Sequence, residues 1–152
     1  MKKTLILLLI MISLFIGGCS NKEESSTEDN NNQVEQKGEL VVLSFDELQA
    51  KIDNKDSFIL VVTQTTCSHC AEYRPILTAV LEKYNVVAYE IESDKLTTEE
   101  RGLMNDIANV SGTPTTIFIE DGVETTTTNR IVGPASQSKL VAKLTSMGYI
   151  KE

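Results

Sequence analysis

Cys67 and Cys70 enclose Ser68 and His69 in a CxxC tetrad, the stretch of this chain whose chemistry is easiest to define. Two thiols two residues apart at the start of a helix can alternate between dithiol and disulfide without distorting the fold. The tetrad therefore predicts a thiol–disulfide exchange site. Paired cysteines can also bind a metal or form a structural disulfide, and features elsewhere in the sequence distinguish these uses.

Three residues of the tetrad have expected roles. Cys67 comes just before an expected helix, where free backbone N–H groups and the positive end of the helix dipole favour the nucleophilic thiolate. Cys70 lies one turn deeper, so it suits the resolution of a mixed disulfide. His69 is the only histidine, and it can stabilise the Cys67 thiolate by charge or by a hydrogen bond. That stabilisation would make the disulfide form a better oxidant.

Metal and haem uses of the tetrad are weaker hypotheses. Cys67, His69 and Cys70 could supply three zinc ligands, but the sequence offers no apparent fourth ligand. Attachment of c-type haem requires a histidine directly after the second cysteine, and Ala71 stands there, which excludes that reading. We therefore predict neither a metal nor a cofactor.

The N-terminus indicates where the chemistry takes place. Lys2 and Lys3 precede an apolar run from Leu5 to Ile16, which is short for a membrane span and ends in two glycines and Cys19. This layout is typical of a secretory signal over residues 1–18, and its end resembles the lipobox of bacterial lipoproteins. The resemblance implies that Cys19 carries lipid and holds the protein at the extracytoplasmic face of the cell membrane. An uncleaved anchor or a secreted protein with a spare thiol are the alternatives.

The lipidated cysteine and the polar segment after it, residues 19–38, are predicted to form a flexible tether. Val34 is the only aliphatic residue among Ser20 to Gly38, so the segment cannot bury enough apolar area to offset the entropy of ordering it. The formal net charge is −8, with no basic cluster beyond the N-terminus. Nucleic acid is therefore not expected as a partner.

Residues 39–152 have the pattern of one globular α/β domain. The expected order is β-α-β-α-β-α-β-β-α, which implies a mixed sheet with helices on both faces. Strands are expected at 40–43, 58–62, 86–91, 115–119 and 124–132, and helices at 44–54, from the cysteines to Tyr84, 97–109 and 136–147. Asp121-Gly122 predicts a hairpin turn before the last strand. The third helix is expected to turn Leu103, Met104, Ile107 and Ala108 inward.

Further landmarks give these elements a family resemblance. Pro75 follows the second cysteine by five residues, Thr113-Pro114 opens the penultimate strand, and Gly133 precedes the last helix. With the CxxC, these positions resemble the thioredoxin fold over residues 40–150, which implies about five strands flanked by about four helices. It also implies a redox-active Cys67–Cys70 disulfide and a cis Pro114 that exposes the Thr113 backbone to an extended substrate. Without the CxxC, an ordinary trans proline would be favoured. Pro75 should kink its helix.

Two departures from the thioredoxin pattern leave the direction of electron flow open. Thr66 stands where thioredoxin has a tryptophan, and Val61 stands where it has a buried acid. The proton of Cys70 then needs another route, through water or Glu90. A histidine in the third position of the tetrad is also found in protein disulfide isomerase and in oxidants of the DsbA type. Thr113 with Thr115 and Thr116 resembles extracytoplasmic reductases of the TlpA type.

Two function classes follow. In the first, the protein is a thiol–disulfide oxidoreductase of exported proteins, served by a membrane redox partner that the sequence does not identify. In the second, it is a non-catalytic binding module that keeps the fold, as is suspected for thioredoxin-like bacteriocin accessory proteins. Replacement of Cys67 and Cys70 by serine separates the two classes.

Overall fold

A computed structural model of the chain describes residues 37–151. The predicted signal, Cys19 and nearly all of the predicted tether lie outside this range. The elements are β1 (Glu39–Val42), α1 (Phe45–Asp53), β2 (Phe58–Thr63), α2 (Ser68–Tyr84), β3 (Val87–Glu92), α3 (Thr98–Ile107), β4 (Thr115–Ile119), the 3-10 turn η1 (Thr127–Asn129), β5 (Ile131–Val132) and α4 (Gln137–Ser146). Their order confirms the predicted α/β domain.

The five strands form one mixed sheet in the order β1-β3-β2-β4-β5. β1 and β2 both pair parallel to β3, whereas β4 is antiparallel to β2 and β5 is antiparallel to β4. Every residue of β2 is buried, as expected for the central strand of a sheet covered on both faces. The chain leaves this central strand directly into the short loop that ends at Cys67, and Cys70 follows in the first turn of α2.

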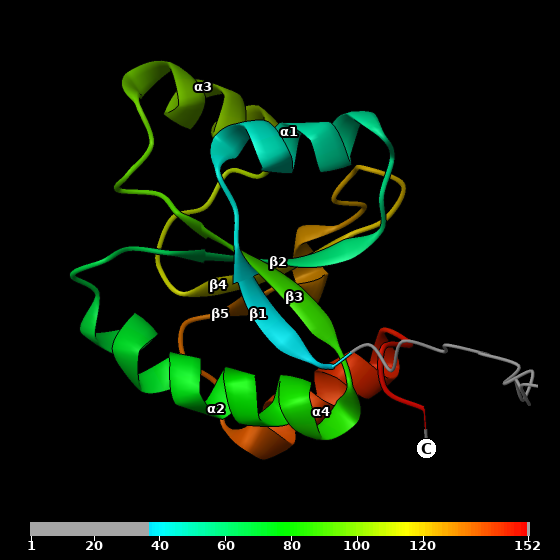
Figure 1. Ribbon diagram of the computed structural model, residues 1–152. Coiled ribbons are helices and arrows are strands. Elements are labelled where there is room, and N and C mark those ends of the chain that lie inside the picture. Colours follow the sequence, from blue (N-terminus) through cyan, green and yellow to red (C-terminus); the bar gives the residue numbers. More distant parts are fainter. Residues whose placement is uncertain (1–36, 152) are drawn as a thin grey trace, which may run out of the picture. The chain divides into compact units, whose positions relative to one another are not determined.

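The helices cover the sheet in two pairs (Figure 1), with α1 and α3 on one face and α2 and α4 on the other. Successive residues of β2 supply both cores because side chains alternate along a strand. Ile59 and Val61 pack with α2 and α4, while Leu60 and Val62 pack with α1 and α3. A tetrad at the start of α2 is therefore held against the sheet by a continuous apolar core.

Side-chain caps fix the starts of three helices where the sequence predicted them. Ser44 and Thr97 form capping boxes with Glu47 and Glu100. Each cap hydroxyl accepts the backbone N–H of its glutamate, and each glutamate carboxylate accepts the backbone N–H of its cap residue. Ser136 caps α4. Within residues 37–151, none of the helices has the length and apolar composition that a membrane crossing requires.

The partner of β4 is shorter than expected, and the prediction of a strand over 124–132 is wrong. Asp121 and Gly122 form the tight turn, with φ of 51° and 77°, but only Ile131–Val132 pairs with β4. Arg130 explains the difference, because its Nε donates to the Glu124 carboxylate at 2.6 Å. In a continuous strand these two residues would lie about 20 Å apart, so the ion pair requires the chain between them to fold back.

The expected inward face of α3 needs a smaller correction. Met104 and Ala108 are buried, but Leu103 is 44% exposed and the helix ends at Ile107. Successive residues of a helix are rotated by about 100°, so Leu103 cannot share the buried line that Met104 and Ala108 define.

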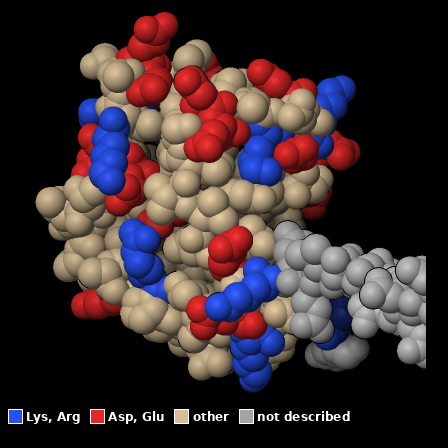
Figure 2. Space-filling model, viewed as in Figure 1, with Lys and Arg blue, Asp and Glu red and all other residues tan. Residues whose placement is uncertain are grey.

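Acidic side chains dominate part of the surface. In Figure 2 the Asp and Glu side chains gather at the top of the view, over α1 and α3, while Lys and Arg are scattered among them. The face shown carries no continuous basic patch.

Candidate active site

Cys67 is the N-cap of α2, in extended backbone conformation. The backbone N–H of Cys70 donates to the Cys67 sulfur at 3.1 Å, taking the place of the side-chain oxygen of an ordinary cap. The sulfur thereby pairs with one of the backbone N–H groups that have no partner within the helix at its start. The same N–H group and the helix dipole stabilise negative charge on Cys67 whenever the disulfide is open.

The two cysteines are joined as a disulfide, with their Cα atoms 5.2 Å apart. They differ in access, because Cys67 is partly exposed and Cys70 is only 3% exposed. A thiol or disulfide in solution therefore meets the Cys67 sulfur first. This arrangement fits the predicted division between a nucleophile and a shielded partner.

Thr113 and Pro114 lie at the same site, as the sequence predicted. The Thr113–Pro114 peptide bond is cis, and the Thr113 carbonyl oxygen lies 3.5 Å from the Cys67 sulfur. The Pro114 carbonyl accepts the backbone N–H of Gly133 at 2.8 Å, which ties the segment to the turn after β5. The start of β4 thus forms one wall of the site.

The loop between β2 and Cys67 is fastened to the end of β3. The Asp94 carboxylate accepts the backbone N–H of Thr65 at 3.0 Å and its hydroxyl as well. The Ser93 hydroxyl donates to the Thr63 carbonyl at 2.9 Å. The hydrogen bond from the Thr65 hydroxyl lowers the pKa of Asp94 below its ordinary value, and the bond from the Thr65 N–H acts in the same direction. Asp94 is therefore a charged acceptor at neutral pH.

The comparisons with known proteins agree with this geometry. The family model described as Thioredoxin matches residues 26–146. The chain belongs to the thioredoxin family. Among solved structures, thioredoxin from Aeropyrum pernix superposes with a TM-score of 0.55 at 24% identity, covering 69% of this chain and 84% of that one. Oxidised thioredoxin O2 from Arabidopsis thaliana gives 0.56 at 22% identity, covering 72% and 95% of the two chains. Thioredoxin NaTrxh from Nicotiana alata gives 0.56 at 21% identity, with 84% and 100% covered.

The buried acid of this thioredoxin-family domain lies on β3. Val61 occupies the position six residues before Cys67, and Glu90 is its direct partner in the parallel β2–β3 pairing. Glu90 is fully buried. Its Oε1 accepts from the Thr63 hydroxyl at 2.7 Å, and Arg74 on α2 donates to both carboxylate oxygens at 2.5 and 2.6 Å. Whether Glu90 moves the proton of Cys70 stays a prediction.

The His69 side chain lies largely in solvent, beside Glu72. Its side chain is 64% exposed, and its Nδ1 lies 3.5 Å from the Glu72 carboxylate. No hydrogen bond joins its ring to Cys67 among the described residues. An effect of His69 on the thiolate would therefore act through charge across solvent, partly offset by Glu72. Its role as a tuning residue stays a prediction.

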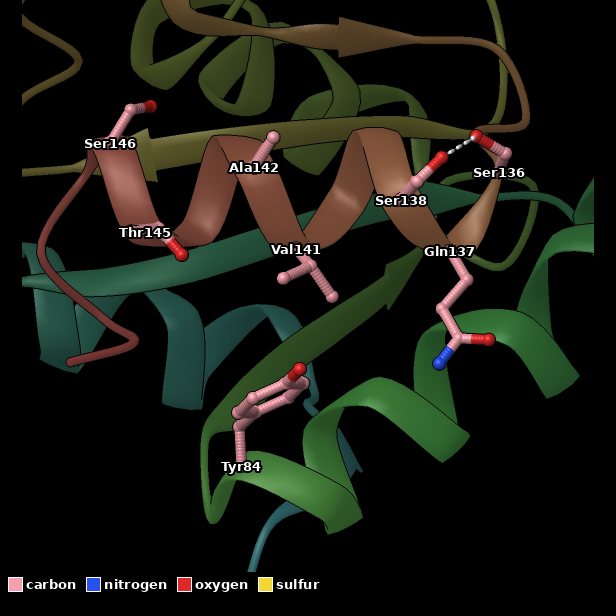
Figure 3. Close-up of a pocket in the computed structure, with 8 residues that line it drawn as sticks. All are labelled: Tyr84, Ser136, Gln137, Ser138, Val141, Ala142, Thr145 and Ser146. Atoms are coloured by element: carbon pink, nitrogen blue, oxygen red, sulfur yellow. Dashed lines mark hydrogen bonds between the residues drawn. The ribbon is translucent and has the colours of Figure 1, made fainter. Parts of the chain in front are cut away.

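One surface hollow of the described domain lies away from the start of α2. It has a volume of about 950 Å³ and lies between α4 and the last turn of α2, with Tyr84 and Gln137 pointing into it from opposite sides (Figure 3). Tyr84 ends α2 and Cys67 caps its start, so about 25 Å of helix separates them. The hollow contributes no residue to the disulfide site.

Sequence reasoning missed the contacts that support the cysteines. Asp94 belongs to no recognisable sequence motif, and its hydrogen-bond partner Thr65 is 29 residues away in the chain. A signal did exist for Glu90, because a carboxylate in the middle of an apolar strand requires a partner when it is buried. Arg74, one turn after Cys70 on α2, was the available cation. Cys19 lies outside the described residues.

Proposed function

We propose that this protein is a thiol–disulfide oxidoreductase, tethered through lipid on Cys19 to the extracytoplasmic face of a bacterial membrane, that exchanges disulfides with exported proteins. One observation carries the chemical part of the proposal. Cys67 combines partial exposure with a sulfur that accepts the Cys70 N–H and lies 3.5 Å from the Thr113 carbonyl. Membership of the thioredoxin family supports the same chemistry.

The exchange proceeds in two displacements. In the reducing direction the Cys67 thiolate attacks one sulfur of a client disulfide, a Cys67–client bond forms, and the other client sulfur leaves as a thiolate. The Cys70 thiolate then attacks the Cys67 sulfur, which forms the Cys67–Cys70 disulfide and releases the second client thiolate. Two electrons pass from the dithiol to the client. The oxidising direction is the same sequence reversed.

The surroundings of the two sulfurs suit these steps. The free N–H groups at the start of α2 stabilise the Cys67 thiolate both as nucleophile and as leaving group. Burial of Cys70 protects it from intermolecular attack, while its position one turn away keeps it within reach of Cys67. The exposed backbone at Thr113 can pair with an extended client segment. A membrane redox partner would reset the pair after each cycle.

The proposed tether follows from the sequence alone. The basic, apolar and small-residue order of residues 1–18 and the position of Cys19 support export and lipidation. The length and polar composition of residues 19–38 support a flexible tether that lets the domain reach clients near the membrane.

The chemical proposal is tested with the full chain in detergent. The reduced protein is mixed with hydroxyethyl disulfide, and released thiol is followed with time. We expect Cys67→Ser to abolish the reaction and Cys70→Ser to accumulate a mixed disulfide on Cys67 that mass spectrometry detects. Equal rates in the wild type and in Cys67→Ser would refute the proposal.

The cellular part is tested in a deletion strain of the host. A Cys67→Ser/Cys70→Ser variant that folds normally and fully replaces the wild type would favour the non-catalytic accessory function. Trapping with Cys70→Ser identifies the clients and the redox partner together. Cys19→Ala serves as the test of the tether: it should abolish attachment of lipid to the protein, as mass spectrometry detects, while leaving exchange of hydroxyethyl disulfide intact.

A further inference from the structure

A cation neighbours Cys70 on the helix that carries it. Cys70 and Arg74 are four residues apart on α2, so their Cβ atoms lie on the same face of the helix, about 5–6 Å apart. Long side chains on a helix lean toward its N-terminus. The Arg74 side chain therefore extends back along the turn that contains Cys70.

The sheet holds the Arg74 guanidinium in place. Its two terminal nitrogens donate to the two carboxylate oxygens of Glu90 at 2.5 and 2.6 Å, and Glu90 Oε1 also accepts the Thr63 hydroxyl at 2.7 Å. Thr63 ends β2, the strand that leads into Cys67, and Glu90 has no exposed surface. The ion pair thus lies between the sheet and α2, at the end of β2 nearest the cysteines.

The other charged neighbours of Cys70 face solvent. The charged or titratable side chains around the first turn of α2 come from this helix, from β3 and from the loop after β3: Cys67, His69, Glu72, Arg74, Glu90 and Asp94. His69 and Glu72 are 64% and 68% exposed, and Asp94 is exposed as well. Water and salt screen exposed charges, whereas buried ones are screened much less. The pair of Arg74 with Glu90 therefore has the strongest influence on Cys70, which is itself only 3% exposed.

The elements packed against α2 add little to this influence. Every residue of β2 and of β4 is uncharged. Glu39 on β1 and Lys139 on α4 are exposed, and Lys143 on α4 donates to Asn129 at 3.3 Å.

The Glu90 carboxylate is poorly placed to accept the proton of Cys70. Both of its oxygens already accept hydrogen bonds, two from Arg74 and one from Thr63. A proton on either oxygen would displace one of these bonds and set an O–H donor against other donors. The geometry therefore suits a carboxylate that holds a cation.

We propose that Arg74 stabilises the Cys70 thiolate while it resolves the mixed disulfide, and that Glu90 is the positioning residue that holds the guanidinium. The inference rests on the proposed function, because it concerns the second displacement of that exchange. The Cys70 thiol gives its proton to water, and the thiolate attacks the Cys67 sulfur. The Cys67–Cys70 bond forms, and the client sulfur leaves as a thiolate. A positive charge beside Cys70 increases the fraction of thiolate available for this step.

The experiment follows the two displacements separately with dipyridyl disulfide and the reduced full chain in detergent. Attack by Cys67 releases one thiopyridone at a rate that depends on the concentration of the reagent. Resolution by Cys70 releases a second one at a rate that does not. For Arg74→Met we expect the second release to be about tenfold slower on the acid side of its pH profile, with the midpoint at higher pH. Glu90→Gln should shift the midpoint to lower pH, because it leaves the guanidinium without its counter-charge.

Two further variants separate charge from structure. Arg74→Lys keeps the positive charge, so its pH profile should remain close to that of the wild type. Lys83→Met removes a cation from the last turn of the same helix, about 20 Å from Cys70. It should leave both releases unchanged, because this distance exceeds the screening length of about 8–10 Å.

The outcomes separate this proposal from the proposed function. An unchanged profile in Arg74→Met would overturn the role of Arg74, and so would a slower second release in Glu90→Gln, which would identify Glu90 as the proton acceptor. Equal slowing in Arg74→Met and Arg74→Lys without a shift of the midpoint would show a structural role and overturn it too. Should reduced Arg74→Met fail to fold, the direction of the shift in Glu90→Gln gives the answer. Absence of the first release in the wild type would instead overturn the oxidoreductase function itself.

Discussion

The stability of the domain should depend strongly on Arg74. Glu90 has no exposed surface, and three of its hydrogen bonds come from Arg74 and the Thr63 hydroxyl. Arg74→Met keeps a long unbranched side chain of good helix propensity on α2. It leaves the Glu90 carboxylate in the interior with the Thr63 hydroxyl as its remaining partner.

The size of the effect follows from the burial of the two partners. Removal of one member of a fully buried ion pair costs about 3–5 kcal/mol, because the other charge is left uncompensated. Here 44% of the Arg74 side chain is exposed, so water can enter along its path and solvate part of the carboxylate. We therefore expect the lower end, about 3 kcal/mol, which corresponds to a fall in Tm of about 10 °C for a domain of this size.

The assay is urea unfolding of the oxidised full chain at pH 7. The companion variant Arg74→Met/Glu90→Gln removes the stranded charge and should recover at least about 1 kcal/mol of the loss, because an uncharged amide is easier to bury. Lys95→Met is the control, since its pair with Glu92 is solvent-exposed on the lysine side. Loss of that pair should cost no more than about 1 kcal/mol.

Two results would contradict this reasoning. A cost below about 1 kcal/mol for Arg74→Met would mean that water or Thr63 satisfies Glu90 without the guanidinium. A double variant less stable than Arg74→Met would mean that the stranded charge is not the source of the loss.

Four further predictions concern the loop before Cys67, the tetrad and two turns. Asp94→Asn removes the charged acceptor of the Thr65 hydrogen bonds. Because the pKa of Asp94 is lowered in the folded state, the wild type should be more stable than the variant above about pH 4. Urea unfolding at several pH values should show this advantage disappear as the pH falls further. His69→Ala should lower the reduction potential, on the order of 30 mV in glutathione equilibration, and an unchanged value would exclude a tuning role. Gly133→Ala should cost about 1–2 kcal/mol in urea unfolding through its φ of +77° alone. Gly122→Ala should cost more, because its Cβ would also meet a backbone oxygen of α1.

The elements that the sequence predicted well are those controlled by neighbouring residues. The two capping boxes, the apolar strand β2 and the Asp121-Gly122 turn each depend on contacts within a few positions of the chain. The cysteine pair and Thr113-Pro114 were predicted from their order along the chain, and the structure brings them within 3.5 Å of one another.

The features that the sequence did not predict depend on register between distant segments. Arg74 and Glu90 meet across 16 residues, and they do so only because β3 lies parallel to β2 beneath α2. The ion pair between Arg130 and Glu124 shortens the last strand, and the alternation of apolar and polar residues used to predict strands carries no information about such a pair. The direction of the His69 ring depends on a side-chain rotation that spacing does not determine.

The position of the Cys67 sulfur is set by segments outside the tetrad. Thr63 is bound on two sides, its hydroxyl donating to Glu90 and its carbonyl accepting from both the backbone N–H and the hydroxyl of Ser93 at 2.9 Å. Two residues later Asp94 holds Thr65. The loop into Cys67 is therefore fixed on the end of β3, while the Thr113 carbonyl, just before β4, lies 3.5 Å from the Cys67 sulfur. Substitutions at these supports should change the reactivity of Cys67 although the tetrad itself is untouched, because the approach of the sulfur to the α2 amide depends on where this loop ends.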